Sequence, residues 1–228
     1  MKTVTVIIPV KNEETGLRYL LKDLSSSGLT SIRVLNLIFV IDSRTSDESI
    51  KIAEMFGGKL IYQVRSTGKG NAIRLGVKEW NKNPTDIVVF LDADGSYSFD
   101  YVGKIIDSVE RGFEVVSGSR FIGTSKPVGM SPLHVLGNRL LSKISGIKNK
   151  RKITDLCTGL WGFSSGALKK IEIRSNGFDL EAELVGLISR RNLSHAEIPV
   201  RWEQRKGGVS KLRSFKDGII ILIRIILT

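Results

Sequence analysis

The regular alternation of apolar runs and helical segments over residues 3–119 is the feature that most constrains the fold of this chain. The runs TVTVIIPV and LNLIFVID are nearly continuous and rich in β-branched residues, as in strands that are buried on both faces. The segment NEETGLRYLLKDLSS, which lies between them, spaces its leucines for one face of a helix. Strand, helix and strand at this spacing predict crossover units, and therefore an α/β fold with a mostly parallel sheet flanked by helices.

The same alternation predicts three further strands before residue 120, in KLIYQV, DIVVFLDAD and EVVSGSRF. The helix expected in TSDESIKIAEMFGG has a capping-box pattern at Thr45 and Glu48 and a stop at Gly57. After residue 120 the alternation ends, and we expect helices in HVLGNRLLSKISG and DLEAELVGLISRRN and a strand in HAEIPVRWEQ. No linker separates the two halves, so residues 1–217 are expected to form one domain with a basic C-terminal elaboration.

The net charge of +12 lies entirely in the second half of the chain. Residues 1–119 hold 15 Lys and Arg against 15 Asp and Glu, whereas residues 120–228 hold 20 against 8. Such asymmetry suggests an anionic partner, either phosphate groups, a nucleic acid or a lipid surface, although charge alone favours a merely solvated basic surface. Binding of a nucleic acid is disfavoured, because no basic platform interleaved with aromatic residues is visible.

The chain ends in the apolar segment SFKDGIIILIRIILT. The stretch from Ile219 to Leu227 is nine residues long with Arg224 inside it, whereas a membrane-spanning helix needs about 20 apolar residues. Residues 218–228 are therefore expected to lie in a membrane interface, to pack on the core, or to begin a longer membrane segment. The single cysteine, Cys157, fits a reducing compartment, and the N-terminus is unlike a secretion signal. We expect a cytoplasmic protein that is peripheral on the cytoplasmic face of a membrane.

Two aspartates, Asp92 and Asp94, directly follow the apolar run IVVFL. In sheets of this class ligands bind outside the carboxyl ends of the strands, and the predicted strands all end in polar residues. Gly95 allows a turn through which both carboxylates can face one cation, and Mg²⁺ and Mn²⁺ prefer such oxygen ligands. A polar loop with two solvated acids is the alternative. The position at a strand end favours a metal site for Mg²⁺ or Mn²⁺.

Other candidate residues suit phosphate groups. The turn Gly68–Asn71 opens a helix, so that it either offers free N–H groups to a phosphate or is simply a basic turn. Asp155, in ITDLCTG, is either a buried turn former or an orienting acid. His134 and His195 lack the spacing of a zinc site and are interpreted as structural or exposed. The basic side chains that match phosphate oxygens, or else are surface charges, are Arg120, Arg139, Arg205, Lys206 and Lys211.

Eight segments carry a resemblance to a known family, and they span about residues 3–217. In order, they are VIIPVKNEE, VIDSRTSDES, STGKGNAIRLG, VVFLDADGSY, GSRF, LGNRLLSKI, ITDLCTG and RKGGVSKL. The chain resembles the inverting family-2 glycosyltransferases of the GT-A, Rossmann-like fold. The last three segments more narrowly resemble the dolichol-phosphate mannosyltransferase and polyprenyl-phosphate glycosyltransferase branch.

The resemblance implies a role for each matching residue. Lys69 and Ala93 would lie beside the nucleotide, and Asp92 and Asp94 would bind the cation that bridges the diphosphate. Asp155 would lie near the transfer site. The nucleotide base and ribose would be held by Pro9, Val10, Asn12, Glu14 and Asp42. The donor diphosphate and the lipid phosphate would be gripped by Arg120, Arg139, Arg205, Ser210 and Lys211.

The chain departs from the family pattern at two places. Family members often read DDGSTD where this chain has DSRTSD, from Asp42 to Asp47. The mannosyltransferases often carry Gln at the position that Ser96 occupies here. These departures leave the base and the sugar open.

The resemblance implies a reaction class. One sugar would pass from a nucleotide-diphosphate sugar, a UDP- or GDP-sugar, to a polyprenyl (dolichyl) phosphate, with inversion and with Mg²⁺ or Mn²⁺. The acceptor phosphate is already an anion at neutral pH, so it needs little help from a general base. A soluble glycosyltransferase that acts on a small phosphorylated or hydroxylated acceptor is the alternative.

Overall fold

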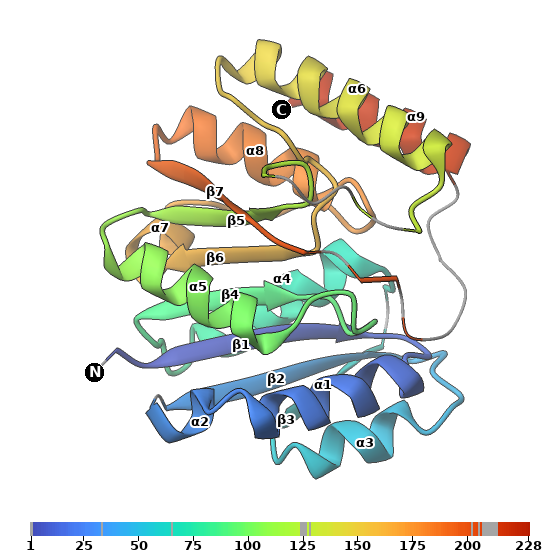
Figure 1. Ribbon diagram of the computed structural model, residues 1–228, viewed down its shortest axis with the longest axis vertical. Helices are drawn as coiled ribbons and strands as arrows, with labels where there is room; N and C mark the ends of the chain where they lie inside the picture. The colour runs from blue at the N-terminus through green and yellow to red at the C-terminus, as the bar shows by residue number, and fades with distance from the viewer. Residues whose placement is uncertain are drawn as a thin grey trace.

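The computed structural model describes residues 2–32, 34–64, 66–123, 127, 129–201, 203–204, 206 and 214–228. Among these residues, one sheet has seven strands in the order β3-β2-β1-β4-β6-β5-β7, with helices on both faces (Figure 1). The strands are β1 (Val4–Val10), β2 (Leu35–Asp42), β3 (Lys59–Gln63), β4 (Ile87–Leu91), β5 (Val115–Ser119), β6 (Leu160–Ser164) and β7 (His195–Pro199).

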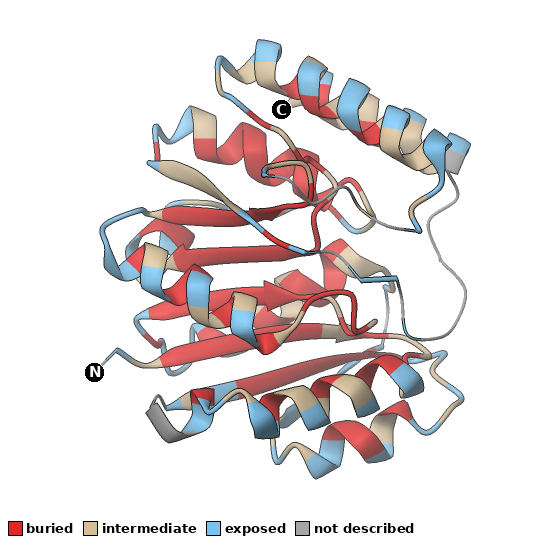
Figure 2. Cartoon of the chain, viewed as in Figure 1, coloured by how far each residue is buried: buried red, intermediate tan, exposed pale blue. Residues whose placement is uncertain are grey.

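The helices bury two apolar clusters against the two faces of the sheet (Figure 2). The five inner strands are buried almost throughout, whereas the edge strands β3 and β7 are largely half-buried or exposed. One face is covered by α1 (Glu14–Ser26), α2 (Leu29–Ile32), α3 (Ser49–Met55) and α5 (Phe99–Glu110). The other is covered by α4 (Lys69–Trp80), α7 (Ser165–Lys169), α8 (Leu180–Arg190) and α9 (Ser214–Leu227). α6 (Pro132–Asn149) packs on α8 and α9, and together α6 and α9 form an outer layer at one end of the molecule (Figure 1).

The predicted α/β fold with a mostly parallel sheet is confirmed. β1 pairs in parallel with β2 and β4, β2 with β3, and β5 with β7. β6 runs antiparallel between β4 and β5, and it was not among the expected strands. It follows the point where the alternation ends, and a glycine interrupts its short run LWGFS. That glycine has a packing role, because a Cβ on Gly162 would lie 2.1 Å from Cγ2 of Ile105 on α5.

The capping box expected at Thr45 and Glu48 is wrong. α3 begins only at Ser49, and Glu48 at its N-cap makes no side-chain hydrogen bond to the helix. Asp47 accepts the Ser49 N–H through Oδ1 over 3.0 Å instead. The expected stop is confirmed, since Gly57 follows the end of α3 with a φ of +67°, in the left-handed region that favours glycine.

The apolar tail forms α9, which packs on the core with one of its faces. Ile221 and Ile225 are buried there, and Arg224 donates from Nε to Asp179 Oδ2 over 2.7 Å. Arg224 Nη1 also lies 3.7 Å from Glu183 Oε1 on α8. Within the part of the chain that the structure describes, every helix is too short or too polar to span a bilayer. The other face of α9 leaves exposed the side chains of Ile219, Ile220, Ile223, Ile226 and Leu227.

Candidate active site

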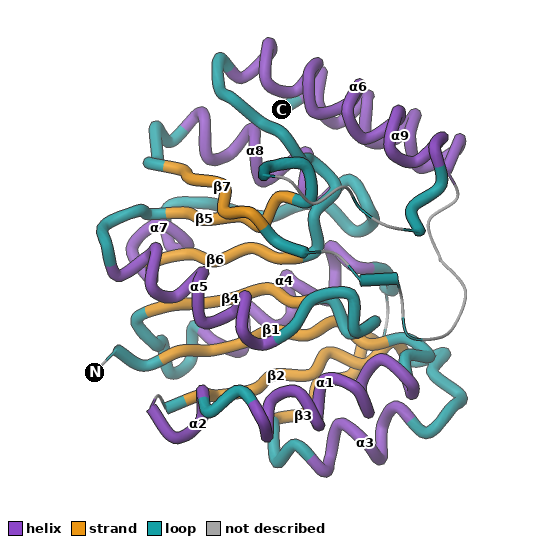
Figure 3. The backbone as a smooth tube through the Cα atoms, in the orientation of Figure 1, coloured by secondary structure: helices purple, strands orange, loops and turns teal. Residues whose placement is uncertain are grey.

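The carboxyl ends of the parallel strands meet at one edge of the sheet, from which the loops after β1, β2, β4 and β5 extend (Figure 3). The strand order reverses between β1 and β4. β1 pairs with β2 as far as Val10 but with β4 only as far as Ile7, so that Pro9 and Val10 extend beyond the pairing with β4. Such a switch point is where sheets of this class bind their ligands.

Asp92 is the first residue after β4, and it is tied to a charged lysine. Lys69 Nζ, at the start of α4, lies 2.6 Å from Asp92 Oδ1 and 2.8 Å from Glu181 Oε1 on α8. The Asp92 side chain is 29% exposed, whereas those of Lys69 and Glu181 are 15% and 8% exposed. Burial by itself would lower the pKa of Lys69, but the two carboxylates outweigh it and raise that pKa. One positive charge thus stands between two carboxylates.

Two glycines allow other parts of the backbone to approach the loop that carries the aspartates. A Cβ on Gly159, the last residue of ITDLCTG, would lie 2.0 Å from Asp92 Oδ2. A Cβ on Gly16, in the first turn of α1, would lie 2.3 Å from the Ala93 carbonyl oxygen. The Asp92 N–H also donates to the Gly159 carbonyl over 3.2 Å. The loop is therefore enclosed by the first turn of α1 and the segment before β6.

The loop turns at Gly95, whose φ of +73° is in the left-handed region. Asp94 Oδ1 accepts the Ser96 N–H over 3.0 Å, which holds this carboxylate within the turn. The Glu203 N–H donates to the Ser96 carbonyl and the Lys206 N–H to the Asp94 carbonyl, each over 3.3 Å. The chain after β7 thus returns to cover the aspartate loop.

The turn that opens α4 does not offer free N–H groups to a phosphate at Gly70 and Asn71. The Gly70 N–H donates to the Gly177 carbonyl and the Asn71 N–H to the Asn176 carbonyl, each over 3.2 Å. Gly68 has a φ of +118°, and a Cβ there would lie 2.3 Å from the Asn176 carbonyl oxygen. The glycines of this turn serve close packing against the segment before α8, so the interpretation as a basic turn holds.

Arg120 and Asp155 form a buried ion pair beyond the end of β5. Arg120 donates from Nε to Asp155 Oδ2 over 2.6 Å and from Nη2 to Oδ1 over 2.7 Å, a bidentate arrangement. The Arg120 N–H and the Asn138 side-chain amide donate to the same carboxylate over 2.9 and 2.6 Å. Burial opposes the charge of Arg120, but Asp155 outweighs it and raises the pKa of the guanidinium. Asp155 is thus both buried and an orienting acid.

The loops after β1 and β2 are joined by side chains predicted to face the nucleotide. Asn12, with a φ of +47°, accepts the Ser46 N–H through Oδ1 over 2.8 Å. Asp42 is held by Arg44, whose Nη2 donates to Oδ2 over 2.8 Å and whose Nε donates to Oδ1 over 2.9 Å. These bonds lower the pKa of Asp42. Glu14 opens α1 beside this loop pair. Arg44 is a position where the chain departs from the family pattern, so that departure alters the environment of Asp42.

Arg139 is another predicted phosphate ligand that the structure describes. Arg139 is exposed on α6, with Cζ 5.4 Å from the centroid of the Phe121 ring. Of the predicted phosphate ligands, Arg205, Ser210 and Lys211 lie outside the described residues.

The aspartate loop fits a divalent cation whose remaining ligands come from a substrate. Among the residues that the structure describes, no group of three or more His, Cys, Asp or Glu side chains is arranged to hold a metal ion. Mg²⁺ is commonly bound by one or two carboxylates, with waters and substrate phosphates as the remaining ligands. Asp92 already faces a positive charge, the Lys69 ammonium. The donor set therefore suits a cation that protein and diphosphate hold jointly.

Sequence reasoning missed three residues of this region. Glu181 shares the lysine with Asp92, and Asn138 binds Asp155. The Tyr97 hydroxyl accepts an N–H from the segment before β6 over 3.2 Å, and burial raises its pKa to about 12. A signal was available only for Glu181, which is an acid among the apolar residues of DLEAELVGL. Acids in such a helix are rarely buried without a partner.

Comparison with known proteins agrees with this geometry. The model of the family described as Glycosyl transferase family 2 matches residues 5–172. From Haloferax volcanii, Glycosyltransferase AglJ is 26% identical over 97% of this chain and 70% of its own length. The Dolichyl-phosphate hexose transferase of the same organism is 28% identical over 96% of this chain and 90% of its own length.

A solved structure is also similar. It is glucosyl-3-phosphoglycerate synthase from Mycobacterium tuberculosis, in complex with Mn²⁺, uridine diphosphate and phosphoglyceric acid. Its TM-score is 0.72 at 18% sequence identity, and the match covers 98% of this chain and 78% of that one. The likeness shows that the chain has the GT-A fold.

Proposed function

The chain belongs to glycosyl transferase family 2, and we propose that it transfers one sugar from a nucleotide-diphosphate sugar to a polyprenyl (dolichyl) phosphate with inversion. The observation that carries the proposal is the Asp92–Asp94 loop at the switch point of the sheet, where a lysine ammonium already lies 2.6 Å from Asp92. The relative named Dolichyl-phosphate hexose transferase supports the acceptor class, since its match covers most of both chains.

On the donor side, Asp92 and Asp94 would hold Mg²⁺ or Mn²⁺ against the diphosphate. The similar solved structure binds Mn²⁺ together with uridine diphosphate, which supports a UDP-sugar among the donors and Mn²⁺ among the metals. The ion would act as a Lewis acid for the leaving diphosphate. Lys69 would give up its contact with Asp92 to the cation while it keeps its contact with Glu181. Pro9, Val10, Asn12, Glu14, Asp42 and Ala93 would line the nucleotide.

On the acceptor side, a phosphate oxygen would attack the anomeric carbon as the bond from that carbon to the diphosphate oxygen breaks. The products are the lipid-linked sugar phosphate and the nucleoside diphosphate. The attacking phosphate is already an anion, so no general base is needed, but two anions must be brought together. Arg120, which Asp155 holds in place, would offset that repulsion, and the other proposed phosphate ligands are Arg139, Arg205, Ser210 and Lys211.

The lipid acceptor implies work at a membrane surface. We propose that residues 1–217 form the catalytic domain and that residues 218–228 belong to a helix that lies in the interface on the cytoplasmic face. α9 is apolar on two faces, one of which covers the core while the other is exposed. A helix that is apolar all round is normally buried, and a membrane surface would cover the exposed face.

A second candidate is transfer to a small phosphorylated acceptor. The similar solved structure, glucosyl-3-phosphoglycerate synthase, contains phosphoglyceric acid, and its fold is shared across nearly the whole chain. This candidate predicts turnover without any lipid.

The test is release of nucleoside diphosphate from a panel of UDP- and GDP-sugars, with and without Mn²⁺ or Mg²⁺ and with and without a short polyprenyl phosphate. We expect release that requires both the metal and the lipid phosphate. Release that needs the metal but is stimulated by phosphoglyceric acid instead of the lipid would replace the proposal by the second candidate. Lipid-dependent release that a chelator does not affect would show that the reaction needs no metal, and that part of the proposal would be wrong.

A further inference from the structure

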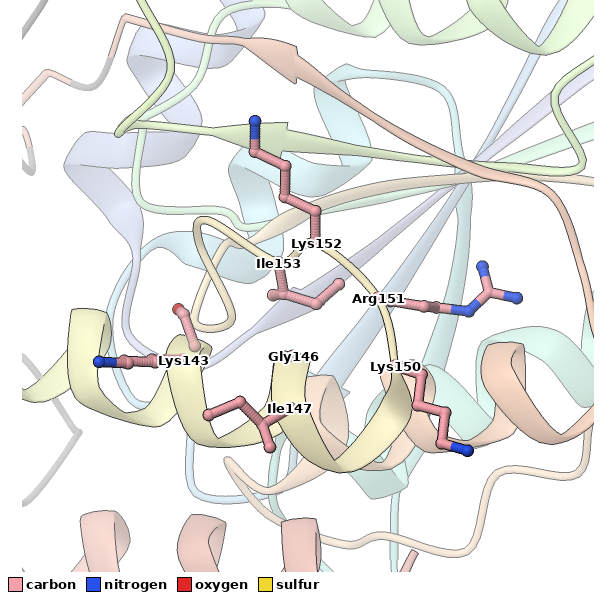
Figure 4. A pocket seen from close by; sticks show the side chains of 8 residues that line it. Lys143, Gly146, Ile147, Lys150, Arg151, Lys152 and Ile153 are labelled. Carbon is pink, nitrogen blue, oxygen red and sulfur yellow. The ribbon is translucent and has the colours of Figure 1, made fainter.

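A hollow of about 400 Å³ lies at the C-terminal end of α6, on a different part of the fold from the aspartate loop. Its apolar lining includes Ile147 and Ile153, and its charged lining consists of Lys143, Lys150, Arg151 and Lys152. Figure 4 shows that these four side chains point in different directions around the hollow instead of converging on one point. The arrangement suits several anionic groups spread over a surface better than it suits a single small anion.

The segment that lines this hollow carries only positive charges. Residues 131–153 contain six Lys and Arg and no Asp or Glu. Arg151 donates from Nη2 to the Ile188 carbonyl over 3.4 Å, and the Lys148 ammonium donates to the Ile226 carbonyl over 2.9 Å, so these two also fasten the segment to α8 and α9. The side chains of Lys143, Lys150 and Lys152 are exposed. Lys143 is on α6, while Lys150, Arg151 and Lys152 form its C-cap and the segment that follows. Such clusters of four to eight basic residues next to an amphipathic helix are typical of sites for anionic lipids.

An exposed apolar row leads along α6 to the same hollow. Leu133, Leu136, Leu140 and Ile147 are spaced for one face of the helix, and each is between 56% and 70% exposed. Leucine side chains in this number contribute nothing to binding of a free phosphate or of a nucleic-acid backbone. They do fit a bilayer, where the apolar row inserts among acyl chains and the lysines meet the headgroups.

We propose that the hollow with Lys143, Lys150, Arg151 and Lys152 is a binding site for the anionic headgroups of a phospholipid bilayer, separate from the acceptor site. The inference rests on the proposed function only in that an enzyme with a lipid-linked acceptor must work at such a surface. It adds the face that meets the bilayer, which is the exposed apolar row of α6 with the basic segment that follows the helix, and the class of lipid that this face selects.

The test is co-sedimentation with vesicles of phosphatidylcholine alone and of phosphatidylcholine mixed with phosphatidylserine. We expect the protein to bind the mixed vesicles far more tightly, and the variant Lys143→Gln/Lys150→Gln/Lys152→Gln to lose about fivefold in affinity per lysine. Raised salt should weaken the wild type more than the variant. The matched control removes three exposed lysines from α1, α3 and α4 in Lys22→Gln/Lys51→Gln/Lys78→Gln, and it should bind as the wild type does.

Thermal unfolding checks that each variant folds, and a triple Lys→Arg variant at the same three positions should retain binding. Donor release with a short polyprenyl phosphate in detergent should be unchanged in the Gln variant, which separates this site from the proposed reaction. Equal binding by the wild type and the Gln variant would overturn the inference, and so would an equal loss in the control. Binding of inorganic phosphate or of an RNA oligonucleotide at these lysines, without binding of vesicles, would overturn it as well.

Discussion

The two ion-pair clusters at the carboxyl edge of the sheet differ in the balance of their charges. Arg120 and Asp155 match one cation with one anion, and the Asp155 side chain is 0% exposed. In the other cluster a single cation, Lys69, serves both Asp92 and Glu181, and Asp92 is partly exposed. A balanced, fully bonded pair holds structure in place, whereas a cluster with an excess carboxylate at the surface attracts another cation. The comparison therefore separates a positioning cluster from the proposed cation-binding one.

The segment before β6 connects the two clusters. It begins at Asp155, which binds Arg120, and ends at Gly159, whose missing side chain makes room for Asp92. Removing the buried carboxylate of Asp155 should therefore destabilise the fold, whereas removing a carboxylate from the aspartate loop beside Gly159 should act mainly on turnover.

The largest effect should come from Asp155→Ala. It leaves Arg120 buried without its carboxylate, and removal of one partner from a buried ion pair costs about 3–5 kcal/mol of the free energy of unfolding. Urea denaturation followed by circular dichroism measures this loss. A variant as stable as the wild type would show that the pair is not what holds the end of β5.

Asp94→Ala should do the opposite. We expect donor release to fall by at least about 100-fold, because a carboxylate of the proposed cation site is lost, while the urea midpoint stays close to that of the wild type. Near-normal turnover in this variant would mean that the aspartate loop does not hold the metal, and the contrast between the two clusters would fail.

Glu181→Gln sharpens the comparison at the unbalanced cluster. Without the Glu181 carboxylate, Lys69 pairs with Asp92 alone and competes more strongly with a divalent cation. The concentration of Mn²⁺ at half-saturation, measured by calorimetry in the presence of uridine diphosphate, should rise about tenfold. Glu79→Gln, at an exposed cluster with Lys59 and Lys82, is the matched control and should leave it unchanged. Unchanged or tighter Mn²⁺ binding in the Glu181 variant would contradict the proposed competition.

The smallest effect is expected at the Arg44–Asp42 ion pair, whose arginine is 58% exposed while its aspartate is buried. Arg44→Ala should raise the pKa of Asp42 toward its ordinary value, because the Arg44 hydrogen bonds lower it. A lowered carboxylate pKa contributes stability above the ordinary pKa, and that contribution is lost as the pH falls through the lowered value. The variant should therefore lose less stability than the wild type on acidification. A carboxyl titration by NMR checks the pKa, and no upward shift would show that other groups set it.

The sheet was predictable because the inner parallel strands β1, β2 and β4 are buried on both faces, which leaves nearly continuous apolar runs rich in β-branched residues in the sequence. The strand ends were predictable because each apolar run gives way there to polar residues. The same change from apolar to polar residues placed Asp92 and Asp94 at the end of β4. β6 could not be predicted, because its short run lies among irregular segments. Its glycine, Gly162, is required by close packing against α5, which is distant in sequence. The sequence marks Glu181 as an acid in an apolar helix, but its partner could not be predicted, because Lys69 lies on another helix and only the tertiary structure brings the two together.

The acidic residues around the start of α8 set a limit on how the protein can be shortened. Asp179 and Glu183 both face Arg224, which arrives from α9, while Glu181 between them faces Lys69. Trimming the apolar tail to ease handling would strip two carboxylates of their cation and uncover the core beneath α9. The damage would fall on the same helical turn that positions Glu181, so a tail-less protein that releases little product would not show that the tail itself takes part in the reaction.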